Sequence, residues 1–138
     1  MKCLSDYIQE EQKEVFKKYG VFFAFSGEQF EEGCKSVGAN KKNKVREMGN
    51  GGYCLSKNFE SCINELNEIH AKGVRRDIEE NGIKEIIMRE LGNYETQITG
   101  RWREAYEVLE DYEGVTEELV LKIYREDFIP LCDKNDWY

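Results

Sequence analysis

The sequence is poor in the residues from which many enzyme sites are built, with one histidine among 138 residues. One histidine cannot supply an H-E-x-x-H zinc motif, and neither the G-x-S-x-G sequence of serine hydrolases nor a P-loop occurs. No apolar run approaches the roughly 20 residues of a membrane span. The first 14 residues are polar and lack the apolar core of a signal peptide, so we expect a cytoplasmic protein that does not bind membranes.

Disulfide signatures are also missing. The five cysteines lie at positions 3, 34, 54, 62 and 132, an odd number without C-x-x-C spacing. Secreted disulfide scaffolds usually pair an even number of cysteines in a shorter chain. We therefore predict free thiols in a reducing compartment, with Cys34 and Cys62 acting as small apolar residues.

The sequence does contain the apolar periodicity of a folded, mostly helical protein. Its length fits a single globular domain spanning residues 1–138, and 12% aromatic residues argue against disorder. The prediction is a helix-dominated α+β fold, with five or six helices around a small antiparallel sheet of two or three strands. Helices are expected over residues 4–19, 26–37, 56–81, 83–94, 101–112 and 116–130, and strands over 21–25, 44–48 and 53–55.

Short sequence signals mark where these elements begin and end. Ser26 followed by Gln29 has the form of a helix capping box. Asn50-Gly51 supplies the positive φ values of a tight hairpin turn, which explains the glycine cluster MGNGGY better than a phosphate loop does. Pro130 is expected to end the last helix.

The net charge of −8 is unevenly distributed along the chain. Residues 1–103 contain 17 basic and 17 acidic residues, whereas residues 104–138 contain 3 basic and 11 acidic residues. The C-terminal quarter therefore carries the whole excess of negative charge.

The most distinctive polar residues for catalysis are His70, Asp77 and Glu90. His70 lies within an apolar helix face, Asp77 lies two turns further along it, and Glu90 lies among the apolar residues of the next helix. If these helices pack antiparallel, His70 and Glu90 could meet as a general base or half of a metal site. The alternative is a structural hydrogen-bonded pair, or a Glu90 that reaches solvent.

A metal site has less support in the sequence. Glu90, Asn93, Glu95 and Asp77 could together offer oxygen ligands to Mg²⁺, but they follow no recognised pattern. We therefore expect no cofactor.

Acidic residues on the predicted helix 101–112 are the candidate contacts for a partner protein. Glu104, Glu107, Glu110 and Asp111 lie opposite its apolar face. Such a face either binds a basic surface, with charge steering the approach, or is simply solvated.

The candidate contacts for nucleic acid lie in the basic segment 35–46, which contains no acidic residue. Its Lys41, Lys42, Lys44 and Arg46 could contact phosphates. However, a chain with a pI near 4.9 lacks the broad basic face of most nucleic-acid-binding proteins, so a solvated loop is the favoured interpretation.

Three stretches carry a resemblance: YGVFFAFSGEQFEEG (19–33), GNGGYCL (49–55) and EIHAKGVRRDIEENGIKEIIMRELGNYE (68–95). Together they resemble a group of small uncharacterised proteins of tailed phages and prophages. A histidine often stands in that group where this chain has Tyr94, which weakens a metal site built on residues 90–95. The resemblance implies no catalytic activity, but it does imply a bacterial host cell.

The resemblance and the charge pattern together favour a non-enzymatic accessory protein. We expect it to bind and modulate a bacterial protein with a basic surface, such as a host-defence component, in the manner of an anti-CRISPR protein. Two alternatives remain: a small general-base or metal-dependent hydrolase using His70 with Glu90 or Asp77, and nucleic-acid binding through segment 35–46.

Overall fold

The computed structural model describes all residues 1–138, and its contacts divide the chain into two compact units. We call residues Leu4–Gly73 the sheet unit, and residues Met1–Cys3 with Val74–Tyr138 the helical unit. Helix α3 (Ser56–Asn81) contributes residues to both. Each unit is described separately below, and the single domain expected from the sequence stays a prediction.

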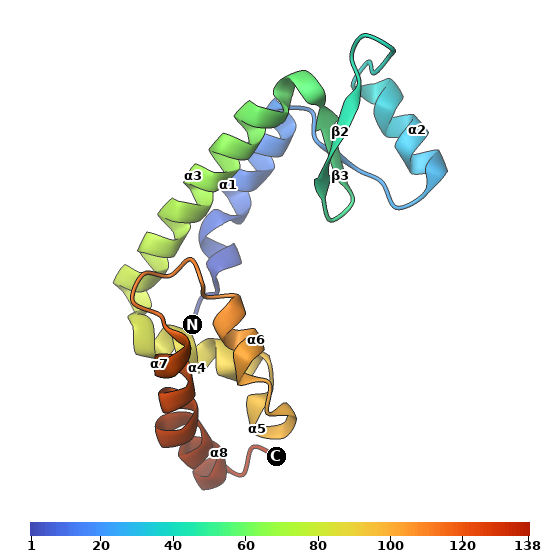
Figure 1. Ribbon diagram of the computed structural model, residues 1–138. Helices are drawn as coiled ribbons and strands as arrows, with labels where there is room; N and C mark the ends of the chain where they lie inside the picture. Colours follow the sequence, from blue (N-terminus) through green and yellow to red (C-terminus); the bar gives the residue numbers. More distant parts are fainter. The chain divides into compact units, whose positions relative to one another are not determined.

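The sheet unit contains all three strands (Figure 1). The antiparallel strand order is β1-β3-β2. Helix α1 runs alongside α3, and α2 lies beside the hairpin of β2 and β3. The elements are α1 (Leu4–Lys18), β1 (Phe22–Phe23), α2 (Gly27–Ser36), β2 (Val45–Gly49), β3 (Gly52–Leu55) and the first part of α3.

The hairpin between β2 and β3 turns where the sequence predicts. Gly49, Asn50 and Gly51 have φ angles of 94°, 53° and 79°. Glycine and asparagine are the residues that adopt such positive angles most readily. The tight turn at Asn50-Gly51 is therefore confirmed.

The strand predicted over residues 21–25 is shorter than expected, because the chain leaves the sheet after Phe23. The backbone N–H of Phe25 donates to Oε1 of Gln29, and Oγ of Ser26 accepts from the backbone N–H of Gln29. These bonds begin α2 and compete with strand pairing. Phe25 is outside β1 and 78% exposed, so the predicted strand is wrong at this position.

Helices α1 and α3 approach closely in the sheet unit at Gly73. A Cβ atom at Gly73 would lie 2.2 Å from Cγ2 of Ile8, so a larger residue does not fit this contact without a shift. Nζ of Lys18 also lies 2.9 Å from Oε1 of Glu65. The buried apolar residues of this unit are Tyr7, Ile8, Val15, Ala24, Cys54, Leu55 and Cys62.

The helical unit packs its helices around an apolar core. Its elements are the last part of α3, α4 (Ile83–Asn93), α5 (Thr96–Thr99), α6 (Trp102–Glu107), α7 (Glu117–Ile123), the π-helical turn η1 (Tyr124–Phe128) and α8 (Ile129–Asn135). Its largest fully buried apolar side chains include those of Ile86, Ile87, Leu91, Leu109 and Val120.

The helix predicted over 101–112 ends earlier, at Glu107. Leu109, Tyr112 and Val115 then follow at intervals of three residues, linked by i to i+3 backbone hydrogen bonds, and all three are buried. Turns with this spacing place the three side chains on one side. Tertiary packing therefore overrides the helical pattern here.

The expectation that Pro130 ends the last helix is also wrong. Pro130 lies in the first turn of α8, directly after η1. A proline inside a regular α-helix would lose one hydrogen bond, and its ring would contact the carbonyl four residues earlier. The wider π-helical turn relieves that contact, so the helical segment continues to Asn135.

The helix-dominated α+β fold class predicted from the sequence is confirmed. The five cysteines are free thiols, and Cys62 is fully buried while Cys34 is partly exposed. No helix combines the length and apolar character that a membrane span requires.

Candidate functional site

A buried ion pair between Asp77 and Arg89 lies in the helical unit. Asp77 is fully buried, and the Arg89 side chain is 6% exposed. Nη1 and Nη2 of Arg89 each donate to one carboxylate oxygen of Asp77 at 2.9 Å. Nε of Arg89 donates to Oε1 of Glu90 at 2.8 Å, and Nη1 also donates to the carbonyl oxygen of Lys2. Arg89 therefore joins two of the carboxylates that the sequence singles out.

Asp77 has two further donors, the hydroxyl of Tyr112 at 2.5 Å and Nδ2 of Asn81 at 2.8 Å. Burial by itself would raise the pKa of Asp77, but the hydrogen bonds from Arg89, Tyr112 and Asn81 hold the pKa below its ordinary value. Burial and the bond to Asp77 raise the pKa of Tyr112. Asp77 is thus an ionised carboxylate with both oxygens engaged.

This arrangement changes the interpretation of the predicted catalytic residues. Glu90 accepts from Arg89 and, at 3.4 Å, from Nδ2 of Asn93. His70 lies on the part of α3 that belongs to the sheet unit, whereas Asp77 and Glu90 belong to the helical unit. The structure brings the two carboxylates to Arg89, a partner that the sequence analysis missed. The signal was Arg89 itself, a charged residue three positions after the buried Ile86.

The residues considered for a metal do not gather into a ligand set. Glu95 is exposed, has a φ angle of 48° and precedes α5. The structure contains no group of three or more histidine, cysteine, aspartate or glutamate side chains placed to hold a metal ion.

The acidic residues considered for partner binding lie in a longer acidic stretch. Residues 104–118, which we call the acidic segment, contain seven acidic and no basic residues. Glu104 is part-buried, and its Oε1 lies 3.9 Å from Nη1 of Arg101. Glu107, Glu110 and Asp111 are exposed. Because α6 ends at Glu107, the four predicted residues occupy a helix and the turns after it rather than one helical face.

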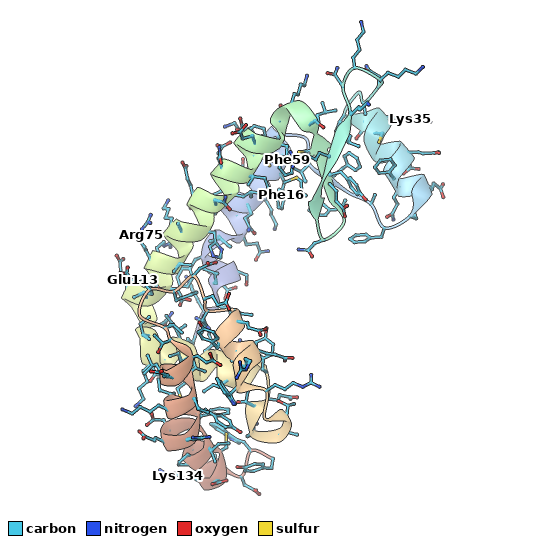
Figure 2. The ribbon with its side chains drawn as sticks, in the orientation of Figure 1. Phe16, Lys35, Phe59, Arg75, Glu113 and Lys134 are labelled. Carbon is cyan, nitrogen blue, oxygen red and sulfur yellow. The ribbon has the colours of Figure 1, made fainter.

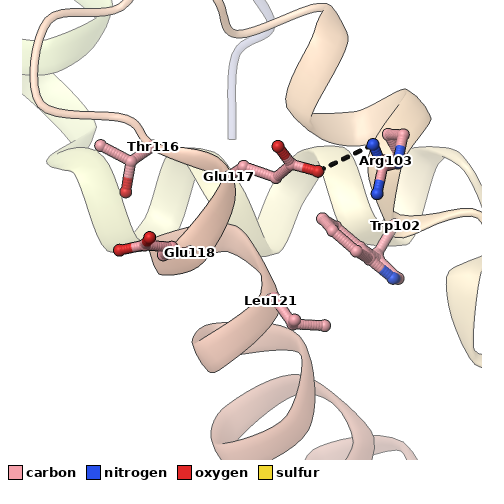
Figure 3. Close-up of a pocket in the computed structure, with 6 residues that line it drawn as sticks. All are labelled: Trp102, Arg103, Thr116, Glu117, Glu118 and Leu121. Atoms are coloured by element: carbon pink, nitrogen blue, oxygen red, sulfur yellow. Dashed lines mark ion pairs between the residues drawn. The ribbon is translucent and has the colours of Figure 1, made fainter.

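A groove of about 440 Å³ lies between α6 and α7, the two helices that the acidic segment joins (Figure 3). Glu117 and Leu121 extend from α7 toward Arg103 and Trp102 of α6. We call this the Trp102 groove; its lining residues are Trp102, Arg103, Thr116, Glu117, Glu118 and Leu121.

One guanidinium is already held in the Trp102 groove. Nη1 of Arg103 lies 2.9 Å from Oε1 of Glu117. The guanidinium carbon of Arg103 lies 5.2 Å from the centre of the Trp102 ring, within the range of a cation–π contact. The groove thus combines an aromatic face with a carboxylate.

The basic segment lies in the sheet unit. Lys41 and Lys42 are exposed in a loop whose Asn40 side chain accepts hydrogen bonds from the backbone of Lys42 and Asn43. The guanidinium of Arg46 lies 3.8 Å from the ring centre of Phe59, on α3. Figure 2 shows Lys35 extending from α2 and Phe59 at the start of α3. Lys41, Lys42, Lys44 and Arg46 are thus all exposed, and Arg46 also stacks on an aromatic ring.

A family model matches most of the chain. Residues 4–126 match DUF7659, described as a family of unknown function. The chain belongs to this family. Neither a curated protein nor a solved structure matches the chain.

The region shared with the family contains every candidate site described above. It includes the sheet unit, the Asp77–Arg89 pair, the acidic segment and the Trp102 groove. Family membership itself identifies no ligand, so the function is argued from these residues.

Proposed function

We propose that this protein is a non-enzymatic accessory protein of a phage or prophage that binds a bacterial host protein with a basic surface. A host-defence component is the partner class that we favour. The acidic segment carries the proposal, because seven acidic residues occur there without a single basic one.

The exposed charges of this segment suit recognition of a basic partner. A concentration of one sign of charge accelerates association with an oppositely charged surface and disfavours partners of like charge. Val108 is 47% exposed between Glu107 and Glu110, so an apolar contact is available among the charges. A partner could therefore bury Val108 while its basic residues meet the carboxylates.

The alternative of a hydrolase has weaker support. A general base needs a lone pair that can accept a proton from the substrate. Both oxygens of Asp77 already accept hydrogen bonds, and Glu90 pairs with Arg89. These contacts favour a structural role for the two carboxylates.

Nucleic-acid binding through the basic segment also has weaker support. The exposed lysines are confined to the loop between α2 and β2, at positions 41, 42 and 44. The guanidinium of Arg46, the one arginine of the segment, stacks on Phe59, and the segment contains no aromatic residue that could stack on bases.

Affinity capture from bacterial lysate at low salt, followed by titration with the purified captured protein, tests the proposal. A variant with Glu107→Lys, Glu110→Lys and Asp111→Lys should bind about tenfold more weakly or worse, equivalent to about 1.4 kcal/mol. The matched control reverses three exposed acidic residues of α2, Glu28, Glu31 and Glu32. Equal losses of affinity in the two triple variants would contradict a role for the acidic segment. The absence of direct binding by the purified captured protein would contradict it as well.

A further inference from the structure

We propose that the Trp102 groove receives an arginine side chain of the basic partner, in the place that Arg103 occupies in the structure. This inference rests on the proposed function, because it assumes that the acidic segment binds a basic protein. It adds the residue type that is recognised and the residues that recognise it.

The groove itself shows what it can hold. Arg103 contacts the face of Trp102 and pairs with Glu117 within the same small volume. A guanidinium is planar, so it can lie against an indole ring while its edge donates to a carboxylate, whereas a lysine ammonium offers a point charge only. The geometry therefore favours arginine over lysine.

Arg103 can be displaced from this position at little cost. Its side chain is 65% exposed and that of Glu117 is 44% exposed. Exposed ion pairs of this kind contribute little to stability. An incoming arginine can therefore replace Arg103 without breaking the core of the helical unit.

Charge complementarity identifies the occupant as a basic protein segment. The two ends of the acidic segment meet at the groove. Trp102 and Arg103 directly precede the segment, and Glu117 and Glu118 are its last two residues. Its volume of about 440 Å³ is within the usual range for a ligand cleft. An arginine that enters the groove would place neighbouring basic residues of the partner beside Glu107, Glu110 and Asp111.

A second copy of this chain is a poorer occupant. Each copy carries a net charge of −8, so like charges oppose self-association. The oligomeric state is measured in the same experiment, and peptide-independent dimers that require Trp102 would overturn the assignment to a separate basic partner.

The test uses the full chain and short synthetic peptides in which arginine, lysine or citrulline alternates with glycine and serine. Binding is measured by calorimetry and by Trp102 fluorescence in a Trp137→Phe background. The arginine peptide should bind several-fold more tightly than the lysine peptide of equal charge, and the citrulline peptide should not bind. Equal affinity for arginine and lysine peptides would contradict the inference.

Two arginines allow a matched comparison. Arg103→Gln should strengthen binding of the arginine peptide several-fold, because it frees Trp102 and Glu117. Arg101→Gln removes the same charge from a side chain of similar exposure, 67%, that pairs with Glu104 and does not line the groove. It should strengthen binding less, and equal effects of the two variants would show that only overall charge matters.

Trp102→Leu keeps an apolar side chain in the groove but removes the aromatic face. It should abolish the preference for arginine over lysine while thermal unfolding followed by circular dichroism shows that the fold is retained. If Trp102→Leu unfolds the chain, Glu117→Gln is used in its place, because it removes the carboxylate of the groove that pairs with a guanidinium.

The possible failures are distinguishable. In one outcome, charge reversal at Glu107, Glu110 and Asp111 abolishes peptide binding, whereas substitutions of Trp102 and Arg103 leave it unchanged. That outcome overturns the groove assignment and leaves the proposed function standing. Failure of both the peptides and the captured host protein to bind overturns both.

Discussion

The hydroxyl of Tyr112 donates a 2.5 Å hydrogen bond to Oδ2 of Asp77, which lies 35 residues earlier in the chain. This bond ties the turns of the acidic segment to the end of α3. Arg89 of α4 donates to the same carboxylate. Three parts of the helical unit therefore meet at one buried charge, and the position of the acidic segment depends on it.

Tyr112→Phe should destabilise the protein without unfolding it. The change removes one hydrogen bond to a charged group, while Arg89 and Asn81 still hold Asp77. We expect a loss of about 1.5–3 kcal/mol in the free energy of unfolding, measured by urea denaturation. An unchanged free energy of unfolding would show that the bond contributes nothing net to stability.

Asp77→Ala should be more severe, because it leaves the buried Arg89 guanidinium with Glu90 as its one carboxylate partner. Breaking a buried ion pair typically costs about 3–5 kcal/mol. The double variant Asp77→Ala/Arg89→Met should recover part of this loss, since no buried charge is then left unpaired. A double variant as unstable as the sum of its single variants would count against the pairing.

Stability should fall at both ends of the pH range. The pKa of Asp77 is depressed below its ordinary value of 3.8, so its contribution is present above that pH and is lost as the pH falls through the lower folded-state pKa. The pKa of Tyr112 is raised above its ordinary value of 10.0, so its contribution is present below pH 10.0 and is lost as the pH rises through the higher folded-state value.

Single substitutions separate these two effects. In chemical denaturation across pH, Asp77→Asn should flatten the acidic fall, and Tyr112→Phe should flatten the alkaline fall. Parallel curves for the wild type and both variants would mean that other groups control the pH dependence.

Gly73→Ala should destabilise the sheet unit through its contact with Ile8. The added Cβ lies 2.2 Å from Cγ2 of Ile8, and overpacking of this kind costs about 1–3 kcal/mol. This loss should exceed the roughly 1 kcal/mol that alanine contributes in a helix. In a double-mutant cycle, Ile8→Ala should cancel part of the effect. If the losses in free energy of unfolding from Gly73→Ala and Ile8→Ala simply add in the double variant, the contact between the two residues relaxes freely.

The parts of the fold that depend on neighbouring residues follow from the sequence. Asn50-Gly51 sets the hairpin, and Ser26 begins α2 by local hydrogen bonding. The apolar periodicity and Gly82, with a φ angle of 75°, divide α3 from α4 as predicted. In each case the chemistry of a few consecutive residues decides the conformation.

The parts that depend on distant residues do not follow from the sequence. The periodicity of residues 101–112 predicts one helix, but the chain forms tight turns after Glu107 and Tyr112 bonds to Asp77. The Asp77–Arg89 pair joins residues 12 positions apart across a helix break. Nothing in the local pattern of either residue identifies the other as its partner. The Trp102 groove is likewise formed by packing of α6 on α7.

The most direct test of the proposed function is the salt dependence of the dissociation constant for the purified host protein that this chain captures. If the acidic segment is the contact, binding should weaken steeply with salt, and Glu107→Gln/Glu110→Gln/Asp111→Gln should bind more weakly with a shallower slope. The control Glu28→Gln/Glu31→Gln/Glu32→Gln should follow the wild type. A dissociation constant that is independent of salt, or equal slopes for the two triple variants, would contradict the account.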